Sequence, residues 1–240
     1  MTQTKHLDLL LVTPVYNEAA NLPGFITDWV MLLKTLDIDF VIRFYNDGST
    51  DESKSRIKEY ADQYSEIEIV EKQNSGHGST LIKAYSEAKN AEWIFQVDSD
   101  HELDHHRFKL FWNSRQQYDL LLGQRFAENK QGVFRILLSK VSFLMIRSLF
   151  GKGINDCNCP YRLMRLTSVH SFLPKIPTNC FAPNVLLSAL FIQAGQRVTN
   201  ISVNQVFRKK RSITGFSYVM LKGGFNTFIC LIKLRFFSGK

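Results

Sequence analysis

Apolar runs of strand length alternate with helix-like segments through the first half of the chain. The runs at residues 7–12 (Leu-Asp-Leu-Leu-Leu-Val) and 40–45 (Phe-Val-Ile-Arg-Phe-Tyr) are typical of buried strands. Between them, Phe25, Trp29 and Leu33 recur at helical spacing, after Asn21, a plausible helix cap. By the same criteria we predict strands at residues 67–70, 91–97 and 119–123, and helices ending near residues 64, 89 and 117.

This order of strands and helices predicts an α/β fold. Strand, helix and strand at such spacing indicate right-handed βαβ units, and hence a mostly parallel central sheet with helices on both faces. In a sheet of this kind the loops that follow the strands face one crevice, where ligands bind. We therefore expect residues 13–18, Asp47, residues 74–78 and the pair Asp98 and Asp100 to line one pocket.

The second half of the chain contains two further helix-like stretches. Residues 132–150 combine a wide apolar face with an opposite face whose charges are all positive, which suits a helix lying in the plane of a membrane interface. A core-facing helix of a second subdomain is the alternative. Neither this stretch nor residues 225–237 has the roughly 20 uninterrupted apolar residues of a spanning helix, so we predict peripheral attachment.

Charge divides the chain unevenly. Residues 1–128 hold 21 acids and 13 Lys/Arg (net −8), whereas residues 129–240 hold one acid and 17 Lys/Arg (net +16). A nearly acid-free basic half favours an anionic membrane surface or a phosphate-bearing substrate, because a merely soluble surface usually mixes both signs. Strand-like sequence begins near Leu7 without an apolar leader, so we expect a cytoplasmic location at the inner face of the cell membrane.

The sequence also bears on zinc and nucleic-acid binding. Four cysteines without paired CxxC motifs indicate reduced thiols, and redox or metal chemistry at Cys157 and Cys159 is the alternative. A pI near 9.3 would suit a non-catalytic nucleic-acid-binding protein, the alternative from a different class. No helix-turn-helix, RNP or zinc-finger signature is present and the first half is acidic, so we predict no nucleic-acid partner.

Two carboxylates one residue apart, Asp98 and Asp100, follow the predicted strand at residues 91–97. In extended chain both lie on the same side, and hard oxygen ligands there suit Mg²⁺ or Mn²⁺ carrying a diphosphate. Alone, the pattern favours a strand end followed by a polar turn, and only its surroundings change that interpretation. Since these ions do not select imidazole, we interpret the neighbouring histidines as solvated loop residues: His101, His105 and His106.

Four motifs in order give the chain a resemblance to a known family. They are Thr-Pro-Val-Tyr-Asn-Glu (13–18), Asn-Asp-Gly-Ser-Thr-Asp (46–51), Asn-Ser-Gly-His-Gly (74–78) and Val-Asp-Ser-Asp (97–100). Over residues 7–220 the chain resembles the family 2 glycosyltransferases of the GT-A fold. Within them it is similar to the polyprenyl-phosphate branch, which includes dolichyl-phosphate mannose synthase-like enzymes.

The resemblance implies a role for each matching residue. Pro14, Tyr16 and Glu18 would line the base and ribose of a nucleotide-sugar donor and Asp47 would bind the base, while Asp98 and Asp100 would hold its diphosphate through the metal. Gly76 belongs to a glycine-rich helix entry, where backbone N–H groups approach phosphate. The chain departs from the family at Asn46, where an acid is usual, and at Glu102, where Gln is frequent and an oxygen ligand remains available.

In the basic half, the resemblance points to one acid and to one basic cluster. Asp156 would orient or accept an acceptor proton, or fix Arg162 against a phosphate; its alternative is a structural ion pair, for example with Arg162. Arg208 and Arg211, before a Gly-x-Ser that ends at Ser217, would bind donor or acceptor phosphate. The alternative is a solvated surface patch. We assign Asp156 and Asp100 as catalytic, and Arg162 and Ser217 as acceptor-binding.

Taken together, the resemblance implies an inverting hexosyltransferase. Residues 1–128 would bind the nucleotide-diphosphate sugar, and residues 129–240 would form the acceptor-binding, membrane-associating part of the same catalytic domain. The expected acceptor is a lipid phosphate such as undecaprenyl phosphate. A saccharide or other hydroxyl acceptor is the alternative, and it would require a carboxylate base.

Overall fold

Seven strands form one sheet in the computed structural model, which describes residues 6–125, 143–204 and 218–237. From edge to edge the strands are β3 (Ile67–Lys72), β2 (Phe40–Asp47), β1 (Leu7–Val15), β4 (Ala91–Gln96), β6 (Arg162–Arg165), β5 (Leu120–Arg125) and β7 (Val198–Val203). β6 runs antiparallel to both of its neighbours, and every other pairing is parallel. The carboxyl ends of the parallel strands therefore meet at one edge.

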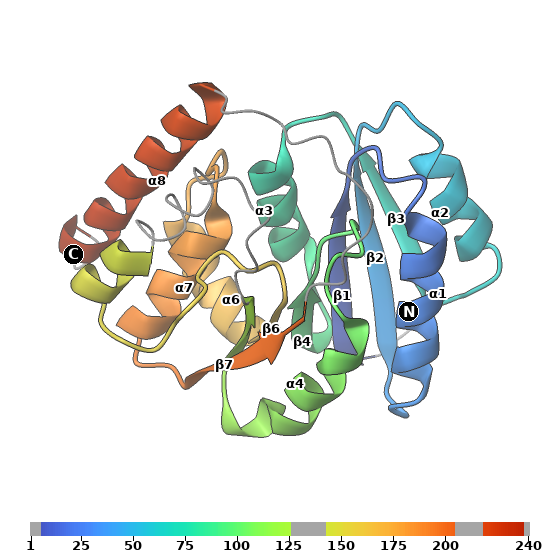
Figure 1. The fold of residues 1–240 in the computed structure, drawn as a ribbon, viewed down its shortest axis with the longest axis horizontal. Helices are drawn as coiled ribbons and strands as arrows, with labels where there is room; N and C mark the ends of the chain where they lie inside the picture. Colours follow the sequence, from blue (N-terminus) through green and yellow to red (C-terminus); the bar gives the residue numbers. More distant parts are fainter. Residues whose placement is uncertain (1–5, 126–142, 205–217, 238–240) are drawn as a thin grey trace, which may run out of the picture.

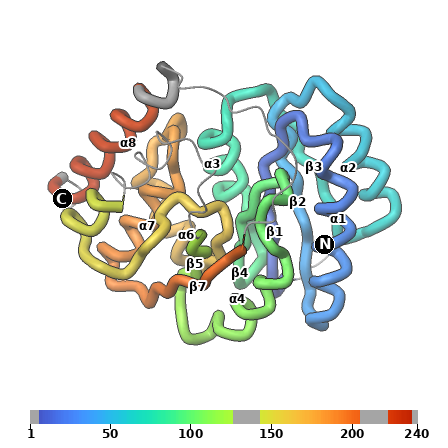
Figure 2. Tube along the Cα trace, viewed as in Figure 1, coloured from blue at the N-terminus to red at the C-terminus, as the bar shows by residue number. Residues whose placement is uncertain are grey.

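Helices cover both faces of the sheet (Figure 1). One face packs against α1 (Leu22–Lys34), α2 (Ser53–Ala61) and α4 (Phe108–Ser114), and the other against α3 (His77–Glu87), α6 (Leu166–Phe172) and α7 (Pro183–Gln193). α8 (Tyr218–Phe237) lies outside α7 (Figure 2). This arrangement confirms the predicted α/β class, with a mostly parallel central sheet and helices on both faces.

A cluster of buried aromatic rings holds the middle of the sheet. The ring of Phe95 on β4 lies 4.7 Å from that of Phe108 and 4.8 Å from that of Tyr161, and Trp29 of α1 packs on the same group. Edge-to-face pairs of this kind add to the free energy gained by burial. The cluster therefore fixes β4, whose carboxyl end carries Asp98 and Asp100.

The predicted strands are all present, with ends shifted by a few residues. The predicted helix up to residue 117 is α4 flanked by two short 3₁₀ turns, His105–Arg107 and Arg115–Gln117. Of residues 132–150, those from 143 to 149 form a helix and those before 143 lie outside the described residues. β6 and β7, which the sequence pattern did not predict, join the second half of the chain to the sheet. Among the described helices, none combines the length and apolar character needed to cross a membrane.

Candidate functional site

Hydrogen bonds join the loops after β1 and β2. The Asn17 N–H donates to Ser49 Oγ (3.1 Å), and Asn17 Oδ1 accepts from the Thr50 N–H (2.8 Å). The N–H of Glu18 donates to Ser53 Oγ (2.9 Å). Asn17 has a φ of 56°, a conformation that Asn adopts more readily than most residues. The two motifs therefore lie side by side at the carboxyl edge of the sheet.

Asp47 fastens the loop after β3. Its carboxylate accepts hydrogen bonds from the N–H groups of Ser75 and Gly76, each at 2.9 Å, and it pairs with Lys72 at the end of β3. Asp47 is almost fully buried. Gly48 follows with a φ of +69°, and a Cβ there would lie 2.9 Å from the Asn74 nitrogen, so this turn requires glycine. The predicted contact from Asp47 to a nucleotide base stays a prediction, beside this structural role.

The loop after β4 is tied back to β1. Ser99 Oγ donates to the Pro14 carbonyl at 2.9 Å, which brings the two acids alongside the first motif. Asp98 is 27% exposed, and its Oδ1 accepts from Gln96 Nε2 at 3.0 Å. Asp100 Oδ1 accepts from the Glu102 N–H at 3.2 Å. Four separate motifs thus meet at one edge of the sheet, as the predicted topology requires.

The acids beyond β4 offer the oxygen donors that Mg²⁺ and Mn²⁺ prefer. Within the described residues, the side chain found at ion-pair distance from Asp98 is His77, whose Nε2 lies 3.8 Å from Oδ1, while the charge of Arg125 acts on Asp98 from further away. A partly exposed carboxylate that no lysine or arginine of the described residues contacts directly fits a bound cation. Asp98, Asp100 and Glu102 are not among the triads of the described residues whose ligand atoms lie within 4.8 Å of one another. Their role as metal ligands therefore stays a prediction.

Tyr16 and Glu18 of the first motif differ in their exposure to solvent. Tyr16 is 48% exposed, and its predicted contact with a nucleotide stays a prediction. Glu18 is 9% exposed, and its Oε2 accepts from Asn21 Nδ2 at 2.7 Å, next to the start of α1. The side chain of Asn21 therefore binds Glu18. Contrary to the prediction, it makes no capping hydrogen bond to α1.

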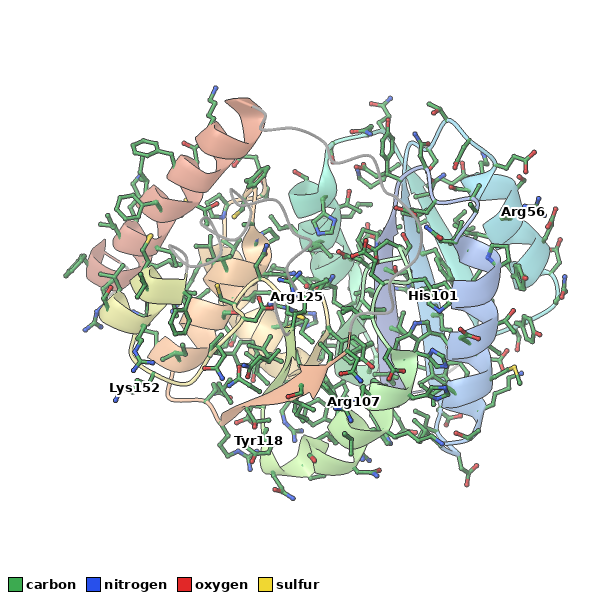
Figure 3. All side chains as sticks on the ribbon, viewed as in Figure 1. Arg56, His101, Arg107, Tyr118, Arg125 and Lys152 are labelled. Atoms are coloured by element: carbon green, nitrogen blue, oxygen red, sulfur yellow. The ribbon has the colours of Figure 1, made fainter. Side chains whose placement is uncertain are left out.

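Asp156 pairs with an arginine that the sequence did not single out. Arg125 at the end of β5 donates from Nε and Nη2 to the two carboxylate oxygens, at 2.8 and 3.0 Å. Burial works against the charge of Arg125, but the hydrogen bonds that Arg125 donates to Asp156, together with nearby charges that include Asp98, raise its pKa above the usual value. The suggested ion pair between Asp156 and Arg162 is therefore wrong. Figure 3 labels Arg125 near the middle of the molecule.

Arg162 is a structural residue at the start of β6. It is fully buried and donates to the carbonyls of Cys157 (2.9 Å), Asn184 (3.1 Å) and Cys159 (3.2 Å). Burial lowers the pKa of this arginine. A side chain with no exposed surface cannot touch an acceptor in this conformation, so the structure argues against the predicted acceptor contact. The prediction assumed an accessible side chain, because arginine is rarely fully buried.

The histidines after Asp100 are not all solvated. His101 is 7% exposed, and its Nε2 lies 2.9 Å from Asp28 Oδ2 of α1, beside which Figure 3 labels it. Burial lowers the pKa of His105, although Asp28 acts in the opposite direction. Asp28 with both histidines forms one group of ligand atoms within 4.8 Å, and Asp104, His105 and His106 form another. The interpretation as solvated loop residues is therefore wrong for His101.

The remaining predictions concern thiols and the basic cluster. All four cysteines are free, and burial raises the pKa of Cys157 and of Cys159 to about 12. Reactive thiols have a lowered pKa, so these two are suited to packing and not to redox chemistry. Three predicted binding residues lie outside the described residues: Arg208, Arg211 and Ser217.

Several polar residues at the site were not predicted as site residues. Gln96 interrupts an otherwise apolar run and could have been noticed, and Arg125 ends a predicted strand at the correct edge. Lys72 occupies the equivalent position on β3. Asn184 lies in α7, far along the chain, and no local pattern connects it with Asp98.

Sequence comparison finds relatives that match most of this chain. Undecaprenyl-phosphate 4-deoxy-4-formamido-L-arabinose transferase of Photorhabdus laumondii is 27% identical over 176 residues, which are 72% of this chain and 54% of that protein. The protein of the same name from Serratia proteamaculans is 24% identical, over 88% of this chain and 63% of its own length. The chain thus spans between about half and two thirds of these relatives.

Solved structures share the fold at low identity. Glucosyl-3-phosphoglycerate synthase from Mycobacterium tuberculosis, in complex with Mn²⁺, UDP and glucosyl-3-phosphoglycerate, matches 95% of this chain and 80% of its own (TM-score 0.66, 14% identity). Staphylococcus aureus TarS 1–349 in complex with UDP-GlcNAc matches 95% and 67% (TM-score 0.62, 15% identity). The predicted GT-A fold is confirmed.

The family model described as Glycosyl transferase family 2 matches residues 10–173, a span that contains all four motifs and Asp156. This confirms the family resemblance. The match covers well over half of the chain. The protein therefore belongs to glycosyl transferase family 2.

Proposed function

We propose that this chain transfers a sugar from a nucleotide-diphosphate sugar to a polyprenyl phosphate, with Mg²⁺ or Mn²⁺ held by Asp98 and Asp100. The observation that carries the proposal is the set of hydrogen bonds that joins four loops around these acids, through Asn17, Asp47 and Ser99. Relatives named as undecaprenyl-phosphate transferases support the acceptor class, and a structural neighbour solved with Mn²⁺ and UDP supports the donor and metal.

The donor would lie along the carboxyl edge of the sheet, from the first motif to the fourth. Tyr16 offers an exposed ring to the base, while Pro14 and Glu18 line the ribose end. Asp47 holds Gly76 at the N-terminus of α3, where backbone N–H groups face an approaching phosphate. Glu102, half-buried beside Asp100, would be the third oxygen ligand of the metal.

Departure of the nucleoside diphosphate is the step that needs charge stabilisation. When bound, a divalent cation neutralises charge that develops on the leaving diphosphate. Arg125 supplies a further fixed positive charge close enough to Asp98 for each to influence the other. The acceptor oxygen would attack from the opposite side of the sugar, so the anomeric configuration inverts.

The pair of Asp156 with Arg125 favours a phosphate acceptor over a saccharide. A hydroxyl acceptor needs a base to take its proton, and both oxygens of Asp156 are already engaged by Arg125. A lipid phosphate is an anion at neutral pH and needs no strong base. In this role Asp156 positions Arg125, and the guanidinium binds the acceptor or the donor phosphate.

A polyprenyl acceptor requires access to a membrane, which α8 would provide. Its exposed side chains include Phe225 and Phe236, at 62% and 66%, together with the basic Lys222, Lys233 and Arg235. Aromatic and cationic residues without acids suit an anionic lipid surface. These side chains support our proposal that the protein attaches peripherally to the inner face of the cell membrane.

The donor assignment is tested by thermal shift with UDP-, GDP- and dTDP-sugars, each with and without Mn²⁺. We expect one donor to raise the Tm in the presence of Mn²⁺, and Asp98→Asn to remove that increment. Asp62→Asn, an exposed acid after α2, is the control and should leave it unchanged. Equal stabilisation of the wild type and of Asp98→Asn would refute the metal-dependent donor site.

The acceptor is tested with the same protein and the donor so identified. Undecaprenyl phosphate and a panel of soluble saccharides are offered separately, and the glycosylated product is measured. We expect transfer to the lipid phosphate. Transfer to a saccharide, with none to the lipid, would establish the alternative acceptor class.

A further inference from the structure

A buried chain of hydrogen bonds ends on Asp98. Tyr85 of α3 donates from its hydroxyl to Asn184 Oδ1 (2.8 Å), and Asn184 Nδ2 donates to Gln96 Oε1 (3.0 Å). Gln96 Nε2 in turn donates to Asp98 Oδ1 (3.0 Å). The exposed fractions of Tyr85, Asn184 and Gln96 are 0, 2 and 0%. Three side chains from three elements thus connect the core to one carboxylate of the candidate site.

The carboxylate fixes the direction of this chain. An ionised Asp98 can only accept, so Gln96 must turn its NH₂ group toward it and its carbonyl toward Asn184. Asn184 must then present its NH₂ group to Gln96 and its carbonyl to Tyr85, which has to donate. Burial raises the pKa of Tyr85, so its hydroxyl keeps the proton that it donates. Both amide dipoles therefore point their positive ends at Asp98.

Asn184, in the middle of this series of hydrogen bonds, is itself held in place by its backbone. The backbone carbonyl of Asn184 accepts from Arg162 Nη1 at 3.1 Å, and Arg162 also holds the carbonyls of Cys157 and Cys159. Asn184 lies in the first turn of α7, directly after Pro183. A buried side-chain amide that lost one of its hydrogen-bond partners would cost free energy. The three side chains are therefore expected to keep their positions together.

We propose that Gln96, Asn184 and Tyr85 are positioning residues that hold the Asp98 carboxylate in the orientation required to bind the divalent cation. This inference rests on the proposed function, because it gives Asp98 its metal-binding role. Hydrogen bonds from neighbouring residues to a metal-binding side chain orient that side chain and tune its affinity for the metal. The three residues act through Asp98 and touch neither donor nor acceptor.

The test compares Gln96→Met, which keeps the length of the side chain and removes the amide, with wild type in the full chain. The readouts are Mn²⁺ binding, followed by electron paramagnetic resonance in the presence of UDP, GDP or dTDP, and the Mn²⁺ concentration for half-maximal transfer. We expect Gln96→Met to weaken Mn²⁺ binding about tenfold. Tyr85→Phe, which removes a neutral donor two bonds further away, should weaken it about threefold.

Ser188→Ala is the matched control. Ser188 lies one turn after Asn184 in α7, is fully buried, and donates to the Cys157 carbonyl at 3.0 Å, outside the chain that ends on Asp98. We expect this variant to lower the Tm without changing Mn²⁺ binding. If Gln96→Met lowers the Tm and binds Mn²⁺ as Ser188→Ala does, Gln96 is merely structural and the inference is wrong.

A double-mutant cycle separates this inference from the proposed function. If Gln96 acts through Asp98, adding Gln96→Met to Asp98→Asn should cause no further loss of Mn²⁺ binding. An additive loss would overturn the inference while leaving Asp98 as a ligand. Asp98→Asn with wild-type Mn²⁺ binding and transfer would refute the proposed function itself.

Discussion

At the scale of single residues, the pair of Asp156 and Arg125 is the feature most exposed to test. Substituting Asp156→Asn leaves a largely buried guanidinium without its charged partner, which should cost about 3 kcal/mol of unfolding free energy. Transfer should also fall, because Arg125 would no longer be held toward the phosphates. Urea denaturation and steady-state kinetics measure the two effects. Wild-type turnover would remove Asp156 from the functional residues.

The pH dependence of this pair follows from the direction of the Arg125 shift. Its pKa in the folded protein is raised above the ordinary value of an arginine, so the stability it contributes is fully present below that ordinary value and is lost only as pH rises further. The difference in unfolding free energy between wild type and Asp156→Asn should therefore be flat from pH 6 to 9 in repeated denaturation curves. A decline within that range would show that another group titrates with the pair.

At the scale of elements, the N-terminus of α3 is held by a close backbone contact. A Cβ on Gly78 would lie 2.2 Å from the Cys180 carbonyl oxygen and 2.6 Å from that of Phe181. Gly78→Ala should therefore push α3 and the 180–181 segment apart, at a cost of about 2 kcal/mol in unfolding free energy. Donor affinity should fall as well, because the loop after β3 moves. Ser79→Ala, at the next position in α3, is the control in the same denaturation and thermal-shift measurements.

The sequence predicted the elements where each signal is local. The first four strands are apolar runs, and because they are parallel, their polar ends had to meet at one edge. β6 has four residues, with an arginine at each end, and no apolar pattern marks it as a strand. Its antiparallel direction brings Arg162 next to Gln96 in the sheet. The partners of Arg162 and Asp156 depend on that pairing, so the sequence could not supply them.

At the scale of the whole molecule, the uneven charge has a structural counterpart. The acid-rich first half supplies β1 to β4, whereas the basic second half supplies α6, α7 and the outer helix α8 (Figure 1). The buried side of α8 includes Leu231 and Leu234, which belong to the core cluster shared with α7. The helix is thus fixed to the domain by one face, and its other face carries aromatic and basic side chains outward.

The proposed membrane contact gives a prediction for that outward face. Replacing Phe225, Phe228 and Phe236 together by Ser should release the protein from vesicles that contain anionic phospholipid, measured by co-sedimentation, while leaving the Tm nearly unchanged because these side chains are exposed. The matched control replaces Met31 and Leu110, exposed apolar residues of α1 and α4, by Ser and should keep wild-type binding.

Binding of the wild-type protein to these vesicles should also weaken from 0.1 to about 0.5 M salt, since part of the attraction comes from Lys222, Lys233 and Arg235. If the triple variant sediments with the vesicles as the wild type does, α8 is not the membrane-binding surface. Lipid transfer would then have to proceed from another face of the domain.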